Sequence, residues 1–246
     1  MAKRNNQLPE GRVALIDTVM RDGYAIVPGV LTAETVALLT QTLNSELPGH
    51  DILQKDGAVY GARNLLRDVP VVRTLAKSAK VRSLVESVLG EEAFAVRGLF
   101  FDKTPSANWP VVWHQDRTIA VREKRDIPGF GPWTVKAGVP HVQPPLAILE
   151  NMLTLRLHLD DCQGTNGPLQ VIAGSHRTGY LDNKAIRTWT SDTRPVSCIV
   201  PQGGAILVRP LLLHSSARAT KPNHRRVIHL EFAAIPLTGG LEWFEQ

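Results

Sequence analysis

The chain has 246 residues, of which 43% are apolar and 21% charged, and its net charge is +5 at pH 7. This composition supports a sizeable core. No stretch approaches the run of about 18 apolar residues that a membrane helix needs, and no apolar run follows the charged N-terminus as in a signal peptide. The basic residues are scattered rather than arranged in a nucleic-acid-binding stripe. We expect a cytoplasmic protein with no membrane or nucleic-acid partner.

The first part of the chain, about residues 1–92, predicts helices. Thr32 is suited to cap a helix that runs to about Leu47. A second helical region covers 70–89, where a proline can occupy the first turn and Gly90 ends the helix.

From about residue 93 to 236 the pattern changes to short strands separated by turn signals. The expected strands are Leu99–Asp102, Val111–Trp113, Leu153–Leu159, Leu169–Ile172, Ala205–Val208 and Val227–Ala234. The segment 117–145 is rich in glycine, proline and charge, and we expect a long loop that acts as a lid. Helices followed by many short strands favour a mainly β fold with flanking helices, a sandwich or jelly roll, in one domain.

Two of these strands alternate strictly between apolar and polar residues. In 153–159 every second residue is leucine, and the residues between include Arg156 and His158. The strand 227–234 behaves in the same way. Alternation gives each strand one polar face, and that face either meets water or lines a pocket inside the fold; the pattern favours neither.

Iron(II) is commonly held by two histidines and one carboxylate, with positions left open for substrates. A His-x-Asp or His-x-Glu pair occurs three times, as His114-Gln115-Asp116, His158-Leu159-Asp160 and His229-Leu230-Glu231, so the motif alone does not identify a site. The first pair follows a strand and enters the long loop, where ligands can face substrate and solvent. The other two lie within strands and are better interpreted as structural pairs.

The third ligand must come from elsewhere, and His214 ends an apolar run near the C-terminus. Arg225 follows across a short loop, which predicts that the two residues lie on adjacent strands of a hairpin-like pair. An arginine fork can bind the free carboxylate of a dicarboxylate co-substrate. We prefer Arg225 to Arg226 because it shares the polar strand face.

Several motifs in this order resemble one family. They are Trp113-His114-Gln115-Asp116, Asn166-Gly167-Pro168-Leu169, Gly174-Ser175-His176, Gly203-Gly204, His214-Ser215-Ser216 and Arg225-Arg226. Together they resemble the phytanoyl-CoA dioxygenase superfamily, most of all its small bacterial members, from about Phe94 to Ala234. The resemblance implies a double-stranded β-helix core, a jelly roll of cupin-like type, with N-terminal helices packed around it.

The resemblance also implies roles for individual residues. His114, Asp116 and His214 match the iron ligands, Arg225 matches the 2-oxoglutarate clamp, and Ser216 matches a hydroxyl that assists it. Arg156 falls near a position where relatives carry an aromatic residue against the co-substrate, so its role is left open. Gln115, Lys103 and His141 are weaker candidates for the pocket wall, and His176 is better interpreted as structural.

The reaction that the resemblance implies is hydroxylation of an unactivated C–H bond in a small molecule. It requires Fe(II), 2-oxoglutarate and O₂, with ascorbate as a stimulant, and releases succinate and CO₂. The retained Asp116 argues against halogenation, for which relatives have glycine or alanine. A cupin-like metal enzyme without 2-oxoglutarate and a non-catalytic binding protein are the alternatives. An acyl-CoA, an amino-acid-like solute and a natural-product intermediate are all open as substrates, as are desaturation or cyclisation and the oligomeric state.

Overall fold

The computed structural model describes residues 10–47, 51–55 and 57–246. The helices are α1 (Glu10–Asp22), α2 (Ala33–Glu46), α3 (Leu65–Asp68), α4 (Pro70–Ala76), α5 (Ala79–Leu89), α6 (Leu146–Glu150), the 3₁₀ helix η2 (Ser175–Thr178) and α7 (Asn183–Asp192). The strands are β1 (Tyr24–Val27), β2 (Ile52–Lys55), β3 (Ala58–Ala62), β4 (Phe94–Asp102), β5 (Val111–His114), β6 (Ile119–Ala120), β7 (Trp133–Lys136), β8 (Val139–Val142), β9 (Met152–His158), β10 (Leu169–Val171), β11 (Val196–Cys198), β12 (Ala205–Val208), β13 (His214–Ser216) and β14 (Arg226–Ala233).

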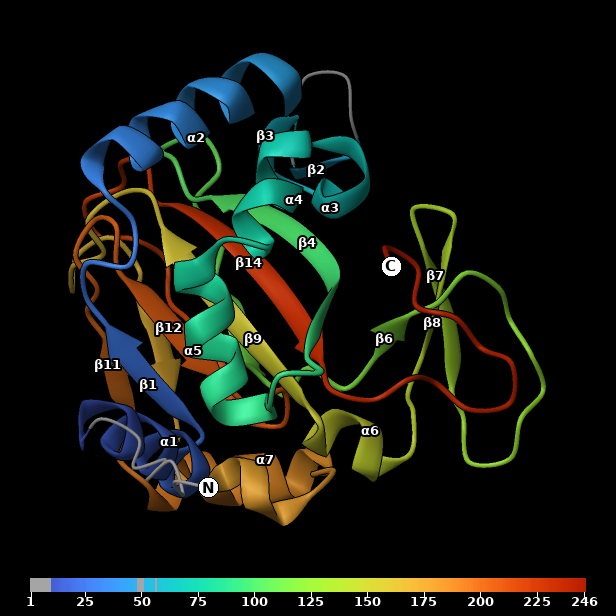
Figure 1. The fold of residues 1–246 in the computed structure, drawn as a ribbon. Helices are drawn as coiled ribbons and strands as arrows, with labels where there is room; N and C mark the ends of the chain where they lie inside the picture. Colours follow the sequence, from blue (N-terminus) through green and yellow to red (C-terminus); the bar gives the residue numbers. More distant parts are fainter. Residues whose placement is uncertain (1–9, 48–50, 56) are drawn as a thin grey trace, which may run out of the picture.

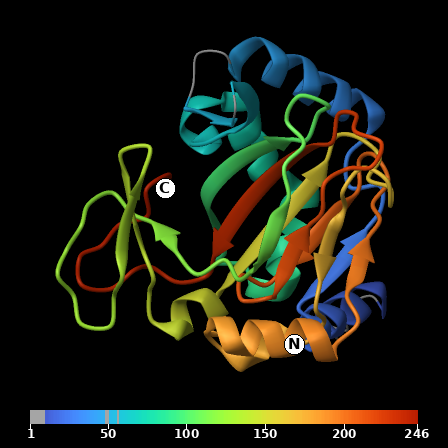
Figure 2. The same ribbon diagram turned by 180° about the vertical axis from the view of Figure 1, so that it is seen from behind.

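Two antiparallel sheets form the centre of the molecule (Figures 1 and 2). The larger has the order β1-β12-β9-β14-β4-β3-β2, and the smaller has the order β11-β10-β13-β5. Strands that are neighbours in each sheet are mostly distant in the chain, as in a jelly roll. The predicted mainly β fold with flanking helices is confirmed.

The helices α2 to α5 cover the outer face of the larger sheet (Figure 1). Their apolar residues, including Leu39, Leu65 and Val81, form one core with Leu155 of β9 and Phe232 of β14. The alternation of the two strands therefore has a simple cause. The leucine face packs on the helices, and the polar face turns inward between the two sheets.

The first predicted helix is confirmed, since the Thr32 hydroxyl accepts a hydrogen bond from the Thr35 amide at the start of α2. The second is correct in extent but is two helices, because the chain breaks at 77–78 between α4 and α5. The first turn of α4 begins at its proline, and Gly90 ends α5 with a positive φ of 89°, which favours glycine.

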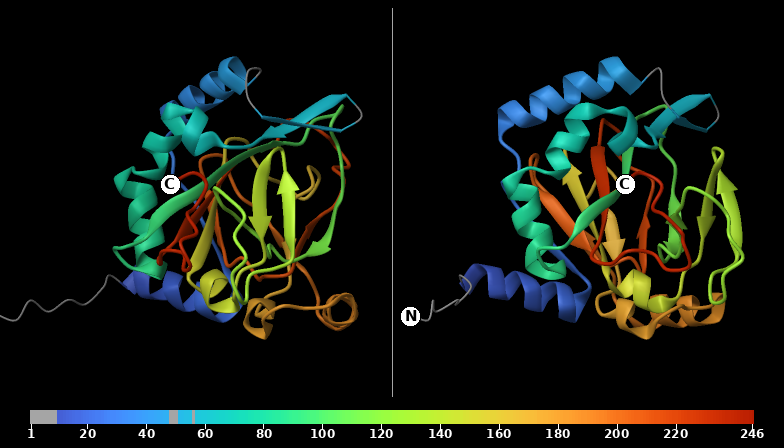
Figure 3. Two further views of the ribbon diagram at one scale, coloured as in Figure 1. Left: turned by 90° about the vertical axis from the view of Figure 1, so that its right-hand side faces the viewer. Right: turned by 45° about the vertical axis from the view of Figure 1, so that its right-hand side comes forward.

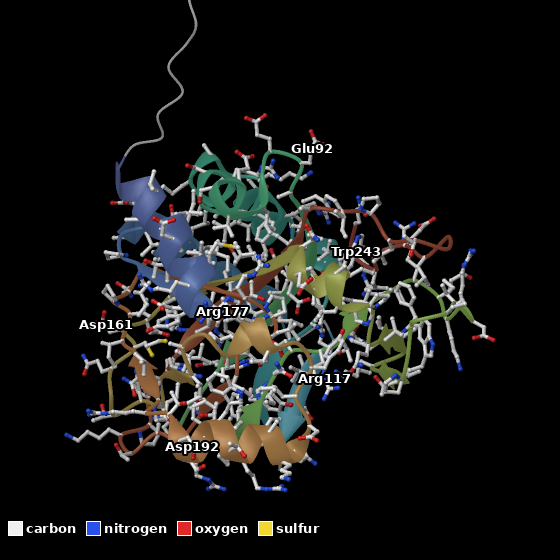
Figure 4. The ribbon with its side chains drawn as sticks, turned by 90° about the horizontal axis from the view of Figure 1, so that it is seen from below. Glu92, Arg117, Asp161, Arg177, Asp192 and Trp243 are labelled. Carbon is white, nitrogen blue, oxygen red and sulfur yellow. The ribbon has the colours of Figure 1, made fainter. Side chains whose placement is uncertain are left out.

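The expectation of an irregular loop over 117–145 was wrong. This segment forms a three-stranded antiparallel sheet, β6-β8-β7, which stands beside the main body (Figure 3). Trp243, near the C-terminus, is buried where this sheet joins the body (Figure 4) and bridges to Val121. Two strand pairings over so few residues are difficult to recognise because glycine and proline dominate the local pattern.

The expected hairpin between His214 and Arg225 was also wrong. His214 begins β13, which pairs with β5 and β10, whereas Arg225 precedes β14, which pairs with β4 and β9. The connecting loop crosses from one sheet to the other, so the two residues lie on facing sheets and not on adjacent strands.

Within the described ranges, no helix has both the length and the apolar character needed to cross a membrane.

Candidate metal centre

The candidate centre is assembled by a strand pair of the smaller sheet. β5 and β13 run antiparallel, and their register places His114 directly opposite His214. Asp116 follows two residues later, where its backbone amide donates a hydrogen bond to the Pro210 carbonyl at 3.0 Å. One ligand atom from each of the three side chains lies within 4.8 Å of the others, and no second such group of three occurs in the part of the chain that the structure describes.

The two imidazole rings are oriented by their backbone partners. Nδ1 of His114 lies 2.8 Å from the Val112 carbonyl, and Nδ1 of His214 lies 2.8 Å from the Leu212 carbonyl. A hydrogen bond to a carbonyl puts the proton on Nδ1 and leaves the lone pair on Nε2. In both residues that free nitrogen faces the Asp116 carboxylate.

The distances fit a transition-metal ion. Nε2 of His114 lies 3.8 Å from Oδ1 of Asp116, and Nε2 of His214 lies 3.7 Å from Oδ2. Two atoms that each bind one ion at about 2.1 Å can lie up to about 4.2 Å apart. Two imidazole nitrogens and one carboxylate are the donor set of non-haem iron(II) sites that keep open positions.

The electrostatics keep these groups in the forms that bind metal. Desolvation in the cavity wall would raise the pKa of the partly accessible Asp116, but the neighbouring His214, His114, His229 and Arg156 outweigh it and hold the pKa at about 2. Burial lowers the pKa of His214 to about 4, against the attraction of Asp116. At neutral pH the site therefore offers a carboxylate and a neutral imidazole.

The other two histidine–acid pairs differ from the first. Asp160 forms a bidentate ion pair with Arg226, and neither ring nitrogen of the buried His158 has a hydrogen-bond partner among the described residues. Nε2 of His229 lies 3.4 Å from Oε1 of Glu231, as expected for a structural pair, although both residues also line the central cavity.

A cavity of about 320 Å³ lies between the sheets and contains the candidate centre in its wall. Its floor is the inward polar face of β4, β14 and β9. There the strand register sets Arg97, Glu231 and Thr154 in one row and Leu99, His229 and Arg156 in the next. The sequence left open whether this face met water or a pocket; it lines the pocket.

Arg225 and Ser216 both line this cavity and are buried. The Arg225 guanidinium and the Ser216 hydroxyl donate to the same acceptor, the Gly167 carbonyl. Gly167 has a φ of +70°, and a Cβ there would lie 2.6 Å from the Ala217 carbonyl oxygen, so only glycine fits this turn. Arg226 points instead to Asp160 and does not line the cavity.

Arg156 lies deep in the cavity wall. Its guanidinium lies 2.8 Å from Nδ1 of His229, and its Nε has no partner among the described residues. Burial and the nearby Arg225 lower the pKa of Arg156 to about 10, so it stays a cation at neutral pH.

The weaker candidates do not line the cavity. Gln115 is a structural residue that donates to the Gly179 and Leu211 carbonyls. Lys103 lies behind the wall and donates to Ser216 Oγ at 2.8 Å and to the Ala217 carbonyl.

His141 is buried in the small sheet beside β6, where burial lowers its pKa to about 4. His176 lies outside the cavity with Nε2 3.2 Å from the Met20 carbonyl, which agrees with a structural role.

Sequence reasoning missed several other residues of the cavity wall. They are Tyr60, Arg63, Arg97, Trp109, Thr118 and Lys136. They come from β3, β4, β7 and the intervening loops, and no short motif connects them. Only the tertiary structure brings them together.

Comparison with known proteins agrees with this architecture. The family model "Phytanoyl-CoA dioxygenase (PhyH)" matches residues 19–227. An ectoine dioxygenase of Sphingopyxis alaskensis is 27% identical over 169 residues, which are 65% of this chain and 48% of that protein. The chain thus spans about half the length of that relative.

A probable alpha-ketoglutarate-dependent hypophosphite dioxygenase of Stutzerimonas stutzeri is 25% identical over 248 residues, covering 88% of this chain and 78% of that one. Among solved structures, EctD from S. alaskensis with 2-oxoglutarate and 5-hydroxyectoine aligns with a TM-score of 0.73 at 22% identity, over 96% of this chain and 79% of that one. The same protein with bound Fe aligns with a TM-score of 0.72 at 21% identity, over 95% of this chain and 79% of that one. The likeness shows a shared fold.

Proposed function

The chain belongs to the phytanoyl-CoA dioxygenase family, and from this premise we propose that it is an Fe(II)- and 2-oxoglutarate-dependent dioxygenase. It hydroxylates an unactivated C–H bond of a small molecule, consumes O₂, and releases succinate and CO₂. The observation that carries the proposal is the set of three ligand atoms within 4.8 Å of one another, in the wall of a cavity that also contains the buried Arg225.

In this proposal His114, Asp116 and His214 hold the iron, which supplies the activation of O₂ when bound. The Nδ1 hydrogen bonds of the two histidines keep both rings turned toward Asp116, so the site is preorganised. The three side chains differ in access, because His214 is buried whereas His114 and Asp116 are partly open to the cavity. An ion held by these residues would therefore be accessible from the cavity.

Arg225 binds the carboxylate of 2-oxoglutarate that is distant from the metal. The buried guanidinium of Arg225 donates to the Gly167 carbonyl, approaches Ser216 Oγ at 3.5 Å and bonds to Cys162. Its Nε has no hydrogen-bond partner among the described residues, so a donor stays available for a carboxylate. Ser216 adds a hydroxyl at the same end of the cavity, and Arg156 supplies a further cation beside His229. The closed, low-dielectric wall strengthens each of these contacts.

We also propose that the chain acts as one domain, since Leu39 and Val81 of the helical part share a core with Leu155 and Phe232 of the sheet. The volume of about 320 Å³ is at the lower end of the range for ligand pockets, ~300–1,000 Å³. It favours a compact reacting group. Relatives named as ectoine and hypophosphite dioxygenases support a small substrate, and ascorbate is expected to sustain turnover.

The test is anaerobic addition of Fe(II) and then 2-oxoglutarate to the metal-free protein. A visible charge-transfer band should appear only with both present, and Arg225→Ala should greatly weaken it at a fixed 2-oxoglutarate concentration. A metal-dependent protein that develops no band and releases no succinate would instead be a cupin-like metal enzyme. A protein that binds neither iron nor 2-oxoglutarate would be a non-catalytic binding protein.

A further inference from the structure

The cavity wall has more positive charge than the proposed cofactors require. Its basic residues are Arg63, Arg97, Lys136, Arg156 and Arg225, and its acidic residues are Asp116 and Glu231. Iron(II) and the 2-oxoglutarate dianion cancel each other, so binding both leaves the positive excess unchanged. A second anion is needed to balance it.

The excess positive charge of the cavity wall lies in two groups, one near each end of β4. Arg225 lies next to the Arg226↔Asp102 pair, and Arg97 pairs with Glu231 at the other end. Arg97 and Asp102 are therefore about 17 Å apart along β4, at ~3.4 Å per residue. The Arg225 end is taken up by the co-substrate in the proposed function, so the charges around Arg97 need another partner.

Arg97 already has a partner, because its guanidinium forms an ion pair with Glu231 at 3.1 Å. Arg63 and Lys136 form no ion pair with any acidic group of the described ranges. The Arg63 Nε atom is buried and has no hydrogen-bond partner there, and the Lys136 ammonium reaches only Thr118 Oγ1, at 3.5 Å.

These cations lie close enough to repel one another. Burial and the neighbouring Arg97 lower the pKa of Arg63. Lys136 is exposed as a whole residue, but partial desolvation at the cavity, Arg97 and Arg63 lower its pKa. Like charges gathered at a cavity mouth without counter-ions destabilise the free protein and attract an anion.

We propose that Arg63 and Lys136 bind an anionic group of the prime substrate, a carboxylate or a phosphorus oxyanion, at the Arg97 end of the cavity. This inference rests on the proposed function. The arginine fork gives the geometry of a bidentate contact, and the lysine adds a mobile point charge at the rim. Anchoring one end there directs the rest of a short substrate toward Asp116.

Two other basic residues, near the start of the small-sheet segment, already have partners. Arg117 stacks on Tyr180 and bonds to Gln143 and the Leu181 carbonyl. Arg122 pairs with Glu242 at the surface. The anion subsite therefore lies on the inner side of the small sheet and not along its outer loop.

The test uses the protein loaded with Fe(II) and 2-oxoglutarate under anaerobic conditions, titrated with acetate, methylphosphonate and acetamide. Binding on the substrate side of the cavity should shift the charge-transfer band. Displacement of 2-oxoglutarate would instead abolish the band. Acetate and methylphosphonate should shift the band with at least about tenfold higher affinity than acetamide, the neutral isostere of acetate.

Arg63→Gln and Lys136→Gln should each weaken methylphosphonate binding by about tenfold while the band itself stays intact. Lys124→Gln removes the same charge from the small-sheet segment but outside the cavity wall, and should change nothing. Lys136 is exposed, so its variant also serves if Arg63→Gln impairs folding. Calorimetry of methylphosphonate binding to the metal-free protein gives a second readout.

Equal affinities for acetate and acetamide, or unchanged affinity in both variants, would overturn the anion subsite while leaving the dioxygenase proposal in place. Absence of the charge-transfer band in the unmutated protein would instead contradict the proposed function. In that case calorimetry of the metal-free proteins would decide on the subsite. If the unmutated protein bound methylphosphonate no more tightly than the Arg63→Gln and Lys136→Gln variants, the subsite would be contradicted as well.

Discussion

His114 and His214 face each other across β5 and β13, with ring centroids 4.2 Å apart. A strand pairing is rigid, so the separation of the two rings is defined before any ligand binds. Asp116 lies just beyond the end of β5 and is the more exposed partner, with 43% of its side chain accessible. The carboxylate is therefore the proposed ligand whose removal tests the site with least damage to the fold.

Asp116→Ala should lower iron(II) affinity by more than about 100-fold, because loss of supporting contacts alone costs 10–100-fold at metal sites. Succinate formation should be abolished. Anaerobic iron titration and succinate release measure the two effects. Asp160→Ala is the control, since it removes the carboxylate of another His-x-Asp pair and should leave iron binding intact. Full turnover by Asp116→Ala would show that the triad is wrongly assigned.

Arg225→Lys should raise the KM for 2-oxoglutarate about tenfold to a hundredfold and change kcat much less. Lysine keeps the charge but loses the fork that makes two parallel bonds to a carboxylate. Initial rates at varied 2-oxoglutarate concentration measure the effect. Arg226→Gln, at the neighbouring position, should leave this KM unchanged because Arg226 binds Asp160 outside the cavity. Equal effects of both substitutions would contradict the clamp.

The clustering of His114, Asp116 and His214 was predictable because it combines local sequence signals with strand ends. His114 and Asp116 are two residues apart, and His214 follows the apolar residues 211–213 and begins the buried strand β13. Arg63, Arg97 and Lys136 carry no such signal, because their proximity depends on how β3, β4 and β7 are arranged. The hairpin error has the same origin, since a short loop in sequence cannot show whether it stays in one sheet or crosses to another.

Gln115→Leu should destabilise the protein by about 3 kcal/mol or more. The Gln115 amide donates to the Gly179 and Leu211 carbonyls and accepts from the Leu181 amide, and leucine would leave these buried groups unpaired at about 1–3 kcal/mol each. Urea unfolding measures the loss. Gln170→Leu is the control, because within the described ranges the Gln170 side chain accepts a single long hydrogen bond, from Ser215 Oγ at 3.5 Å.

Because Gln115 lies between two proposed ligands, iron affinity should also fall in Gln115→Leu, by about tenfold. A variant that unfolds more easily but binds iron as before would show that β5 positions the ligands without help from this side chain.

Glu245 connects the C-terminal segment to the back of the larger sheet. Its two carboxylate oxygens accept hydrogen bonds from the Gly98 amide at 3.0 Å and the Leu66 amide at 2.9 Å. Burial nevertheless raises its pKa to about 7, against these bonds and the nearby Arg97. Arg67 and Glu231 are the other charged groups that influence it.

The raised pKa of Glu245 predicts a loss of stability as the pH rises. The unfolded chain releases this proton near the ordinary value of 4.5, and the folded chain keeps it until about 7. Between these values the unfolded state binds fewer protons, so the free energy of unfolding falls with rising pH and then levels off above about 7. Glu245→Gln should remove the contribution of this carboxyl to the fall in the free energy of unfolding. The stability of the variant relative to the unmutated protein should therefore be greater at pH 8 than at pH 5. Urea unfolding at both pH values measures the difference, and Glu242→Gln, at an exposed position, is the control. If the pH dependence of stability were unchanged in Glu245→Gln, the Glu245 carboxyl would ionise normally in the folded protein.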